Sequence, residues 1–340
     1  MFRWLFPSLL FLILFACKNS RIDEKVSEVK IPEIKFLPLH KDLFSIDTNR
    51  LAQETSRMQK IYGSFYNRYV TSIVNNGGLT DITYAESLKR FVGDATMRDV
   101  ARSCDSVFTP ARITDLQEDL TEAFRRIKSF VPDSFIPQQF VGMMTGFQYH
   151  IVNIDSTLGA GLEFYLGKNA VYYSLLQPPI PDYKKRTMTP DYLVRDMVYG
   201  WIRFKFDNNQ PASNLLQVML HEGKMMYLTK AAIPDMEDSV LLGYTSNQME
   251  YCERFEKDLW RYFSEKNRLY VNDMKELMAY TSDGPFTAAI SKECPPFIAG
   301  YIGYKIIYSY MENNPEVTFA SIMADKDFQR ILSKAKYKPD

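Results

Sequence analysis

The stretch PFIAGYIGYKIIYSYM, residues 296–311, is the most apolar internal run of the chain. It contains Lys305 and is about 16 residues long, whereas a membrane-spanning helix needs roughly 20 apolar residues. Gly300 and Gly303 would let a neighbouring helix approach closely, because glycine has no side chain. We therefore expect a central core helix here, with a hydrophobic groove for a partner as the alternative.

Helical periodicity continues on the N-terminal side of that run. Residues 48–75 carry apolar side chains three, four and seven positions apart, and Gly77 and Gly78 should end this helix. Residues 139–152 and 170–176 are rich in β-branched and aromatic residues without helical spacing, which predicts strands. The fold class is therefore mainly α (α+β), a helical domain with a small β-sheet. Further helices are expected at residues 84–91, 114–130, 191–206, 213–231 and 246–266.

Composition narrows the function classes. The 340 residues include 41 Lys plus Arg and 41 Asp plus Glu, so no chain-wide positive field exists to hold a nucleic acid. With 46% apolar and 24% charged residues, the chain can build a large core but is not a multi-span membrane protein. Since no repeat or Ser/Gly-rich linker interrupts it, we expect one globular domain over residues 36–340.

The N-terminus, MFRWLFPSLLFLILFAC, has the form of an export signal. Leu14 to Cys17 resembles the bacterial lipobox, whose cysteine is acylated with chains such as palmitate and becomes the first mature residue. We expect residues 1–16 to be a lipoprotein signal peptide and residues 17–35, which have mixed charge and almost no aromatic residues, to form the lipidated cysteine and a flexible tether. The alternative is an ordinary secretory signal or uncleaved anchor. The lipoprotein interpretation places the chain in the cell envelope, anchored to the inner or the outer membrane, with its globular domain periplasmic or surface-exposed.

Three cysteines follow the predicted acylation site, namely Cys104, Cys252 and Cys294. A chain of this size does not need disulfides to fold, so three buried thiols are expected even in an oxidising compartment. One disulfide between Cys252 and Cys294 is the alternative.

The segment SNLLQVMLHEGKMMYL, residues 213–228, holds the only motif with recognisable chemistry. In the zinc-peptidase motif HExxH, two histidines one helical turn apart bind the metal and the glutamate acts as base. Here His221 and Glu222 are present on a helix that Ser213 can cap, but Met225 replaces the second histidine. A thioether is a poor zinc ligand, so we expect no zinc and no other cofactor.

A weaker metal site remains as an alternative. Glu253 and Glu256 lie about thirty residues downstream, where one peptidase branch places a glutamate ligand. Glu250 with Arg254, and Glu253 with Lys257, also have the spacing of ordinary solvated ion pairs. His40 and His150, among apolar residues, are expected to be structural, and the basic run 184–186 is expected to be a solvated loop. The sequence contains no GxSxG, P-loop or GxGxxG motif.

Several motifs together resemble the gliding motility lipoprotein GldB family of Bacteroidetes. The resemblance covers nearly the whole chain, and its most specific marks are the HEGK and YLG segments. The family-motif residues are Leu166, Gly167, Lys224, Tyr227, Asp283 and Gly284. The motifs that carry it are the lipobox cysteine, LEFYLG at 162–167, HEGKMMY at 221–227, the acidic helix ending at Trp260, DGPFT at 283–287, the run from Cys294, and SKAKYKP at 333–339.

The resemblance implies a lipid-anchored envelope protein of the gliding machinery, which works alongside type IX secretion. It further implies a zinc-peptidase-like scaffold without the metal, hence a non-catalytic component whose partners are the membrane and other envelope, gliding or secretion proteins. The alternatives are a metal-dependent envelope hydrolase with His221 as ligand, Glu222 as base and Glu253 or Glu256 completing the site, and a peptide- or glycan-binding protein using the groove beside the HEGK helix.

Overall fold

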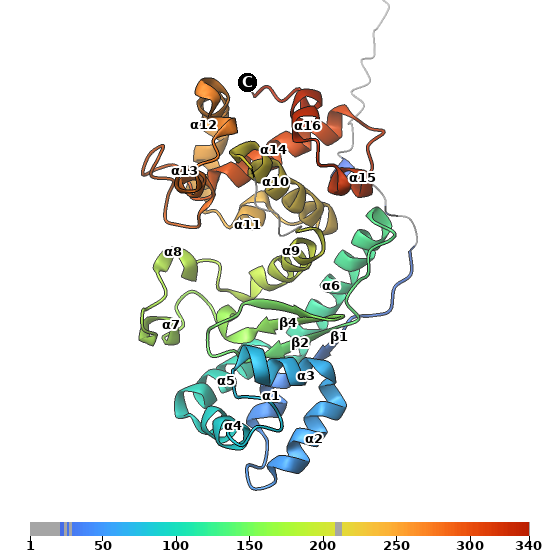
Figure 1. Cartoon of the computed structure of the whole chain (residues 1–340), viewed down its shortest axis with the longest axis vertical. Helices are drawn as coiled ribbons and strands as arrows, with labels where there is room; N and C mark the ends of the chain where they lie inside the picture. The colour runs from blue at the N-terminus through green and yellow to red at the C-terminus, as the bar shows by residue number, and fades with distance from the viewer. Residues whose placement is uncertain (1–20, 24–25, 27–28, 208–212, 340) are drawn as a thin grey trace, which may run out of the picture.

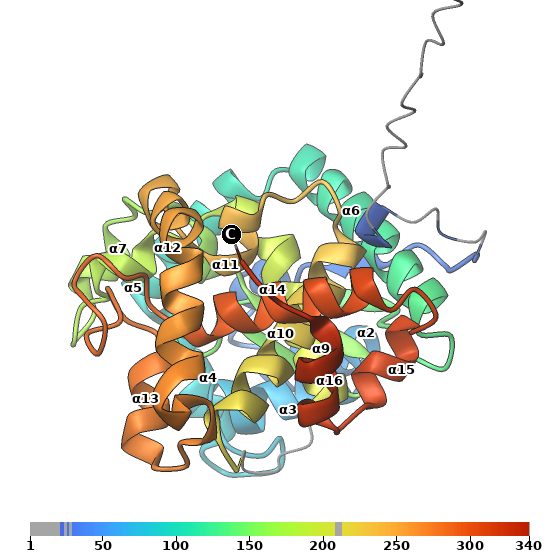
Figure 2. The ribbon, with the colours of Figure 1, turned by 90° about the horizontal axis from the view of Figure 1, so that it is seen from above.

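Two helices that cross at a pair of glycines form the centre of the molecule. The computed structural model describes residues 21–23, 26, 29–207 and 213–339. In it α10 (Leu215–Ala232) and α14 (Ile298–Asn313) lie across each other (Figure 2). A side chain on Gly223 would overlap the Gly303 carbonyl, and one on Gly303 would overlap the Met219 carbonyl. Backbone contact of this kind requires glycine, so the predicted central core helix is confirmed.

The sheet has four strands in the order β1-β2-β4-β3. β1 and β4 each pair with β2 in parallel, whereas β3 pairs with β4 antiparallel. The predicted strand at 139–152 is confirmed in part, because it holds β2 and the start of β3 on either side of a turn. The strands are β1 (Lys35–Leu37), β2 (Gln139–Met143), β3 (Ile151–Ile154) and β4 (Thr157–Gly161).

The strand predicted at residues 170–176 is wrong. This segment forms the short helix α7 (Tyr172–Leu175). Tyr173 is buried, and its hydroxyl donates to the Glu163 carbonyl and accepts from the Leu166 N–H. The aromatic residues that suggested a strand thus serve tertiary contacts, which local propensity does not register.

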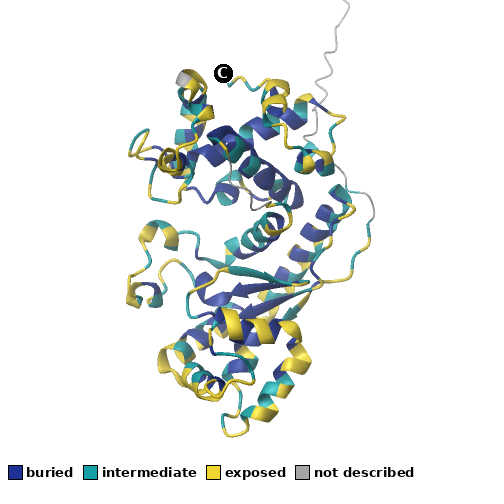
Figure 3. Ribbon diagram, viewed as in Figure 1, coloured by how far each residue is buried: buried dark blue, intermediate teal, exposed yellow. Residues whose placement is uncertain are grey.

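Both faces of the sheet are covered by helices (Figure 1). Val141 and Met143 face a smaller core with α1 (Leu39–Phe44) and α4 (Tyr84–Gly93). Phe140 lies in the larger core, together with residues of the helices α5 (Ala95–Val107), α6 (Pro110–Phe130), α9 (Leu193–Phe206) and α10. Figure 3 shows β2, β4 and α10 as largely buried, whereas β3 is of intermediate exposure. The predicted mainly α fold with a small sheet is therefore confirmed.

The single helix expected at residues 48–75 is interrupted. Gly63 adopts a positive φ of 56° and separates α2 (Leu51–Tyr62) from α3 (Ser64–Arg68). A π-helical turn over Tyr69–Ile73 follows and ends before Gly77. A residue with positive φ ends a helix. The apolar spacing is the same on both sides of Gly63, so the spacing alone does not reveal this break.

Most of the remaining predicted helices are confirmed with small shifts of their ends, including α12 (Ser246–Ser264). The cap of α10 is Asn214 and not Ser213, because the Asn214 side chain accepts from the Gln217 N–H at 3.0 Å. Several helices were not expected from the periodicity, α1 and α5 among them. Others are α8 (Asp182–Lys185), α11 (Asp238–Leu242), α13 (Met274–Thr281), α15 (Phe319–Ala324) and α16 (Phe328–Ala335), with 3-10 turns at Arg21–Asp23, Leu162–Tyr165, Pro190–Tyr192 and Glu265–Tyr270.

The first described residues are attached to the body near the end of α14. The Arg21 guanidinium donates to the Val317 carbonyl at 2.7 Å, and its backbone N–H donates to the Glu312 carboxylate at 3.1 Å. Ile22 is buried, and its carbonyl accepts from the Arg126 guanidinium at 2.9 Å. These contacts fix the 3-10 turn at this point of the body.

The predicted signal peptide, residues 1–16, and Cys17 lie outside the described residues. Within the predicted tether, residues 17–35, Arg21–Asp23 contact the body as above and Lys35 is the first residue of β1. These positions are therefore part of the body. No helix in the described part of the chain is long and apolar enough to cross a membrane.

The three internal cysteines, Cys104, Cys252 and Cys294, are fully buried and their thiols are free. Burial raises the pKa of each thiol, to about 12 for Cys294. The prediction of three buried thiols is thus confirmed. Thiols in this environment remain protonated and are poor nucleophiles.

Candidate functional site

Glu222, the catalytic base of the alternative hydrolase hypothesis, lies where α9 packs against α10. The Tyr199 hydroxyl donates to Glu222 Oε2 at 2.6 Å, and an Arg203 guanidinium nitrogen lies 3.0 Å from Oε1. Glu222 is 7% exposed. Burial, together with this carboxylate, raises the pKa of Tyr199, so its hydroxyl stays protonated and keeps donating. Both carboxylate oxygens of Glu222 therefore already have partners inside the protein.

His221, the metal ligand of the alternative hydrolase hypothesis, is partly exposed beside a different carboxylate. Its Nε2 lies 3.9 Å from Asp207 Oδ1. Burial lowers the pKa of His221, against the opposing charges of Glu222 and Asp207, so the imidazole is neutral at pH 7. Met225, at the position of the second histidine in HExxH, is 1% exposed and belongs to the core. The residues at this point do not fit a zinc ion.

The candidate third ligand, Glu256, belongs to another network. It accepts from the Tyr301 hydroxyl at 2.6 Å and the Tyr337 hydroxyl at 2.7 Å, and Lys305 lies 3.4 Å away. Glu253 is exposed and lines a small surface cavity with Glu256. Nowhere among the residues that the structure describes do three His, Cys, Asp or Glu side chains form a group that could hold a metal ion.

The solvated ion pairs expected on α12 are not formed either. Neither Glu250 with Arg254 nor Glu253 with Lys257 comes within 4 Å in the described structure, although all four residues are exposed. Arg254 instead lies over the Phe255 ring, 5.3 Å from its centroid. Water competes well for exposed charges, so a suitable spacing does not by itself produce a contact.

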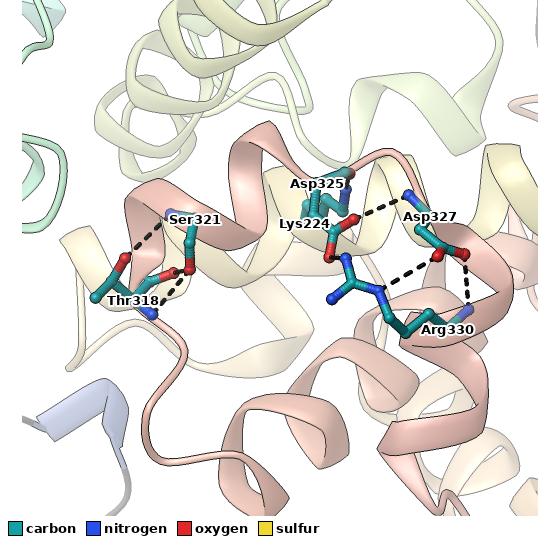
Figure 4. A network of polar contacts seen from close by, with 6 residues as sticks. All are labelled: Lys224, Thr318, Ser321, Asp325, Asp327 and Arg330. Carbon is teal, nitrogen blue, oxygen red and sulfur yellow. Dashed lines mark hydrogen bonds and ion pairs between the residues drawn. The ribbon is translucent and has the colours of Figure 1, made fainter.

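Lys224 of the HEGK motif joins α10 to the C-terminal helices (Figure 4). Its ammonium donates to the Asp325 carbonyl and lies 4.8 Å from the centroid of the Phe328 ring. Burial lowers the pKa of Lys224 to about 8. The Asp325 carboxylate pairs with Arg330 at 2.7 Å, and Asp327 caps α16 through the Arg330 N–H. Lys224 thus acts as a buried connector between helices.

The other family-motif residues serve packing or line a cavity. Tyr227 stacks on Phe319 with ring centroids 5.5 Å apart. Leu166 packs against the core, and Gly167, with a φ of 102°, donates its N–H to the Met188 carbonyl. Asp283 and its neighbour Gly284 lie in the loop after α13. The Asp283 carboxylate is 3.7 Å from Lys184, and both of these side chains line the cavity described next.

A cavity of about 650 Å³ lies between α9, the loop around α8 and the segment that leads into α14. Its apolar wall is made of aromatic rings and prolines, and its charged wall is mostly basic. The wall residues include Phe147, Phe164, Pro178, Pro179, Pro181, Tyr244 and Phe297, and the basic ones are Lys184, Arg186, Arg195 and Arg203. Size and lining are those of a small-molecule or short-peptide site.

One side of this cavity is a polar stripe along α9. Arg195, Tyr199 and Arg203 are spaced by four residues, and the two guanidinium carbons lie 5.3 and 5.9 Å from the centroid of the Tyr199 ring. Arg195 also pairs with Asp196 at 2.5 Å and donates to the Leu241 carbonyl at 2.6 Å. The sequence reasoning missed this stripe, although its spacing within a predicted helix would have indicated it.

Arg186 differs from the solvated loop residue that was expected. It is half-buried, its Nη1 donates to Gln248 Oε1 at 3.1 Å, and its Nε is buried without a partner. The expectation for the basic run 184–186 is therefore wrong at this position. Arg186 contacts α12, which lies about sixty residues downstream, so no local pattern could have shown it.

The remaining histidines have unlike surroundings. His40 is buried, with Nδ1 3.1 Å from the Gly142 carbonyl and Nε2 3.3 Å from Asp105, and this contact lowers the pKa of Asp105. The structural role expected for His40 is confirmed. His150 is exposed and stacks on Phe164 at 3.7 Å between centroids, so it forms part of the cavity wall.

Glu163, from the LEFYLG segment, is a fully buried carboxyl behind the wall residues Phe147 and Phe164. Its Oε1 accepts from the Thr145 hydroxyl at 2.6 Å and from the Thr145 and Phe147 N–H groups, whereas its Oε2 is buried without a partner. Burial raises the pKa of Glu163, and these hydrogen bonds oppose the shift only in part. The motif was noted in the sequence, but this residue was not.

A family model described as gliding motility protein GldB matches residues 19–339. Since the match spans nearly the whole chain, the chain belongs to this family. No curated protein and no solved structure matches the chain. The expected likeness to a zinc-peptidase scaffold therefore has no solved counterpart and stays a prediction.

Proposed function

We propose that this member of the GldB family is a lipid-anchored, non-catalytic component of the cell envelope that acts by binding proteins of the gliding and type IX secretion machinery. In family members from bacteria that do not glide, the same role would be in envelope assembly or secretion. Membership of a gliding motility lipoprotein family supports the location and the process.

The observation that carries the non-catalytic role is the pairing of Glu222. A peptidase base takes a proton from metal-bound water, which needs an uncommitted carboxylate facing the metal. Here Tyr199 and Arg203 occupy both oxygens of Glu222 within the α9–α10 contact. Opening that contact would leave a buried charge without its partner, which is costly. We infer that Glu222 stabilises the packing of α9 on α10 and does not act as a catalytic base.

Lipid anchoring rests on the lipobox-like sequence ending at Cys17. The 3-10 turn at Arg21–Asp23 is the first described part of the body, so only a few residues separate it from the proposed acylated cysteine. At an extended length of roughly 3.3 Å per residue, such a linker holds the body close to the membrane surface. A short link of this kind suits a protein that works within an assembly at that surface.

The test is complementation in a gliding host whose own copy has been deleted. His221→Ala should restore colony spreading and secretion fully, because the imidazole is not required for chemistry, and Glu222→Gln should do so once its cellular level matches that of the wild type. Cys17→Ser should leave the protein outside the membrane fraction and fail to complement. Protein purified without added metal should contain substoichiometric zinc, and a chelator should leave its melting temperature unchanged.

A His221→Ala protein with the wild-type melting temperature but no complementing activity would contradict the non-catalytic role. Stoichiometric zinc that dissociates in this variant would do so directly. Retention of the Cys17→Ser protein in the membrane fraction would contradict acylation.

A further inference from the structure

The charges facing the cavity are balanced at every basic residue but one. Arg195 pairs with Asp196. Arg203 pairs with Glu222, and Lys184 lies 3.7 Å from Asp283. Arg186 is the exception, because no described carboxylate lies within 4 Å of it.

The Arg186 guanidinium is held in place by a neutral group. Gln248, which accepts from Arg186, is itself fixed by the cap of α12, where its side chain accepts from the Thr245 N–H at 3.0 Å and its backbone N–H donates to the Thr245 hydroxyl. The Arg186 Nε–H remains buried with no acceptor. A guanidinium cannot shed its charge, so the folded protein keeps a positive charge beside the cavity that no carboxylate of the described chain balances.

The surroundings of Arg186 indicate the kind of anion. A single unbalanced positive charge favours one negative charge over the two of a phosphate monoester. The guanidinium fork matches the two oxygens of a carboxylate. Apart from the charged residues paired within the protein, much of the wall is aromatic or proline, including Phe164, Tyr244 and Phe297, so a bare inorganic ion would leave most of the roughly 650 Å³ unfilled.

We propose that this cavity binds a ligand that carries one carboxylate on an apolar body, with the carboxylate on Arg186 and the apolar body against the aromatic wall. The C-terminal residue of a peptide and a free small acid share this chemistry. The site goes beyond the proposed function, since it gives the envelope component a recognition pocket, and it requires no reaction at the ligand.

The experiment is calorimetric titration of the full mature chain in detergent. The probes are N-acetyl-phenylalanine, its amide, and acetyl-Ala-Ala-Phe with a free C-terminus. The two acids should bind and the amide should bind at least about tenfold more weakly, since it lacks the charge that meets the guanidinium. At least about tenfold tighter binding of the tripeptide than of the single residue identifies a peptide end as the source, and equal binding identifies a small acid.

Two variants make the assignment specific to Arg186. Arg186→Met should weaken acid binding by about tenfold or more. Gln248→Glu places a carboxylate of the protein on the same guanidinium, so it should abolish acid binding while raising the melting temperature. The matched control is Arg261→Met on the exposed side of α12, where Arg261 pairs with Asp258, and it should bind as the wild type does.

Equal binding of acid and amide, or unchanged acid binding in a folded Gln248→Glu protein, would overturn the proposal. Inorganic phosphate that displaces the acids with higher affinity would also overturn it, in favour of a more highly charged ligand. Mass spectrometry of the recovered tripeptide separates this proposal from the proposed function. Intact peptide supports both, whereas cleaved peptide contradicts the non-catalytic role and leaves the binding site standing.

Discussion

Two regions beside α9, the contact with α10 and the surroundings of Arg186, handle charge differently. Where α9 meets α10, Glu222 has Tyr199 and Arg203 as partners and every polar atom of its carboxylate is used. At the cavity, Arg186 has only the neutral Gln248 and keeps a buried N–H unused. The HEGK motif lies in the first region, whereas the proposed ligand site lies in the second. The proposed ligand site thus rests on an unmatched charge and not on the sequence motif.

The largest effect is expected from removing the Glu222 carboxylate, whose two oxygens both have partners. Glu222→Leu removes the acceptor that Tyr199 and Arg203 share, and because Arg203 is 40% exposed and also lies 3.7 Å from Asp207, the free energy of unfolding should fall by about 2–3 kcal/mol in urea denaturation. Glu250→Leu, at an exposed position of α12, should change it by less than about 0.5 kcal/mol. If Arg186→Met destabilised the protein as much as Glu222→Leu, the contrast between a structural pair and a free charge would be lost.

The next effect concerns Lys224, the buried connector between α10 and the C-terminal helices. Its pKa of about 8 in the folded protein is below the ordinary 10.5, so the unfolded chain holds the proton over a window in which the native protein has lost it. Stability therefore rises with pH through this window. Relative to Lys224→Met, the wild type should gain about 2 kcal/mol between pH 7 and pH 10.

That difference is measured as urea midpoints of the two proteins over the same pH range, so that other titrating groups cancel. Replacement of the exposed Lys257 of α12 by Met should give a flat difference. A flat difference for Lys224→Met as well would show that its ammonium is solvated in the native protein and not a buried connector.

The smallest effect is expected at Glu163, the buried carboxyl behind the cavity wall. Because the pKa of Glu163 is raised on folding, the native protein holds a proton that the unfolded chain releases above its ordinary value of 4.5, and stability falls as pH rises through that window. Glu163→Gln keeps an acceptor for Thr145 and removes the charge. It should be more stable than wild type by about 1 kcal/mol at pH 8 and equal to it near pH 4, as read from thermal denaturation. A wild-type advantage at pH 8 would instead indicate a stabilising partner for the carboxylate.

The central helices α10 and α14 could be predicted, because the apolar content and the glycines that indicate each of them lie within one segment of sequence. β4 could not, since TLGAG holds two glycines and an alanine, which have poor strand propensity. These small residues fit because Gly159 lies against Phe65 and Val152, contacts that exist only after folding.

The candidate site, too, could be predicted from the sequence only in part. The substitution of Met225 for a metal ligand could be recognised in the sequence, because HExxH is local. The pairing of Glu222 with α9, and the approach of Arg186 to Gln248, join residues about 20 and 60 positions apart. Side-chain partners at such separations follow from how helices pack, which periodicity alone does not determine.

The attachment of Arg21 has a mechanical consequence. Its bonds to Glu312 and Val317 place the start of the described chain at the last turn of α14. Tension applied from the N-terminal side would therefore be transmitted first to the helix whose Gly303 interlocks with α10, and only later to the edge strand β1. A pull at this end would thus act on the packed pair of α10 and α14 before it reached the sheet.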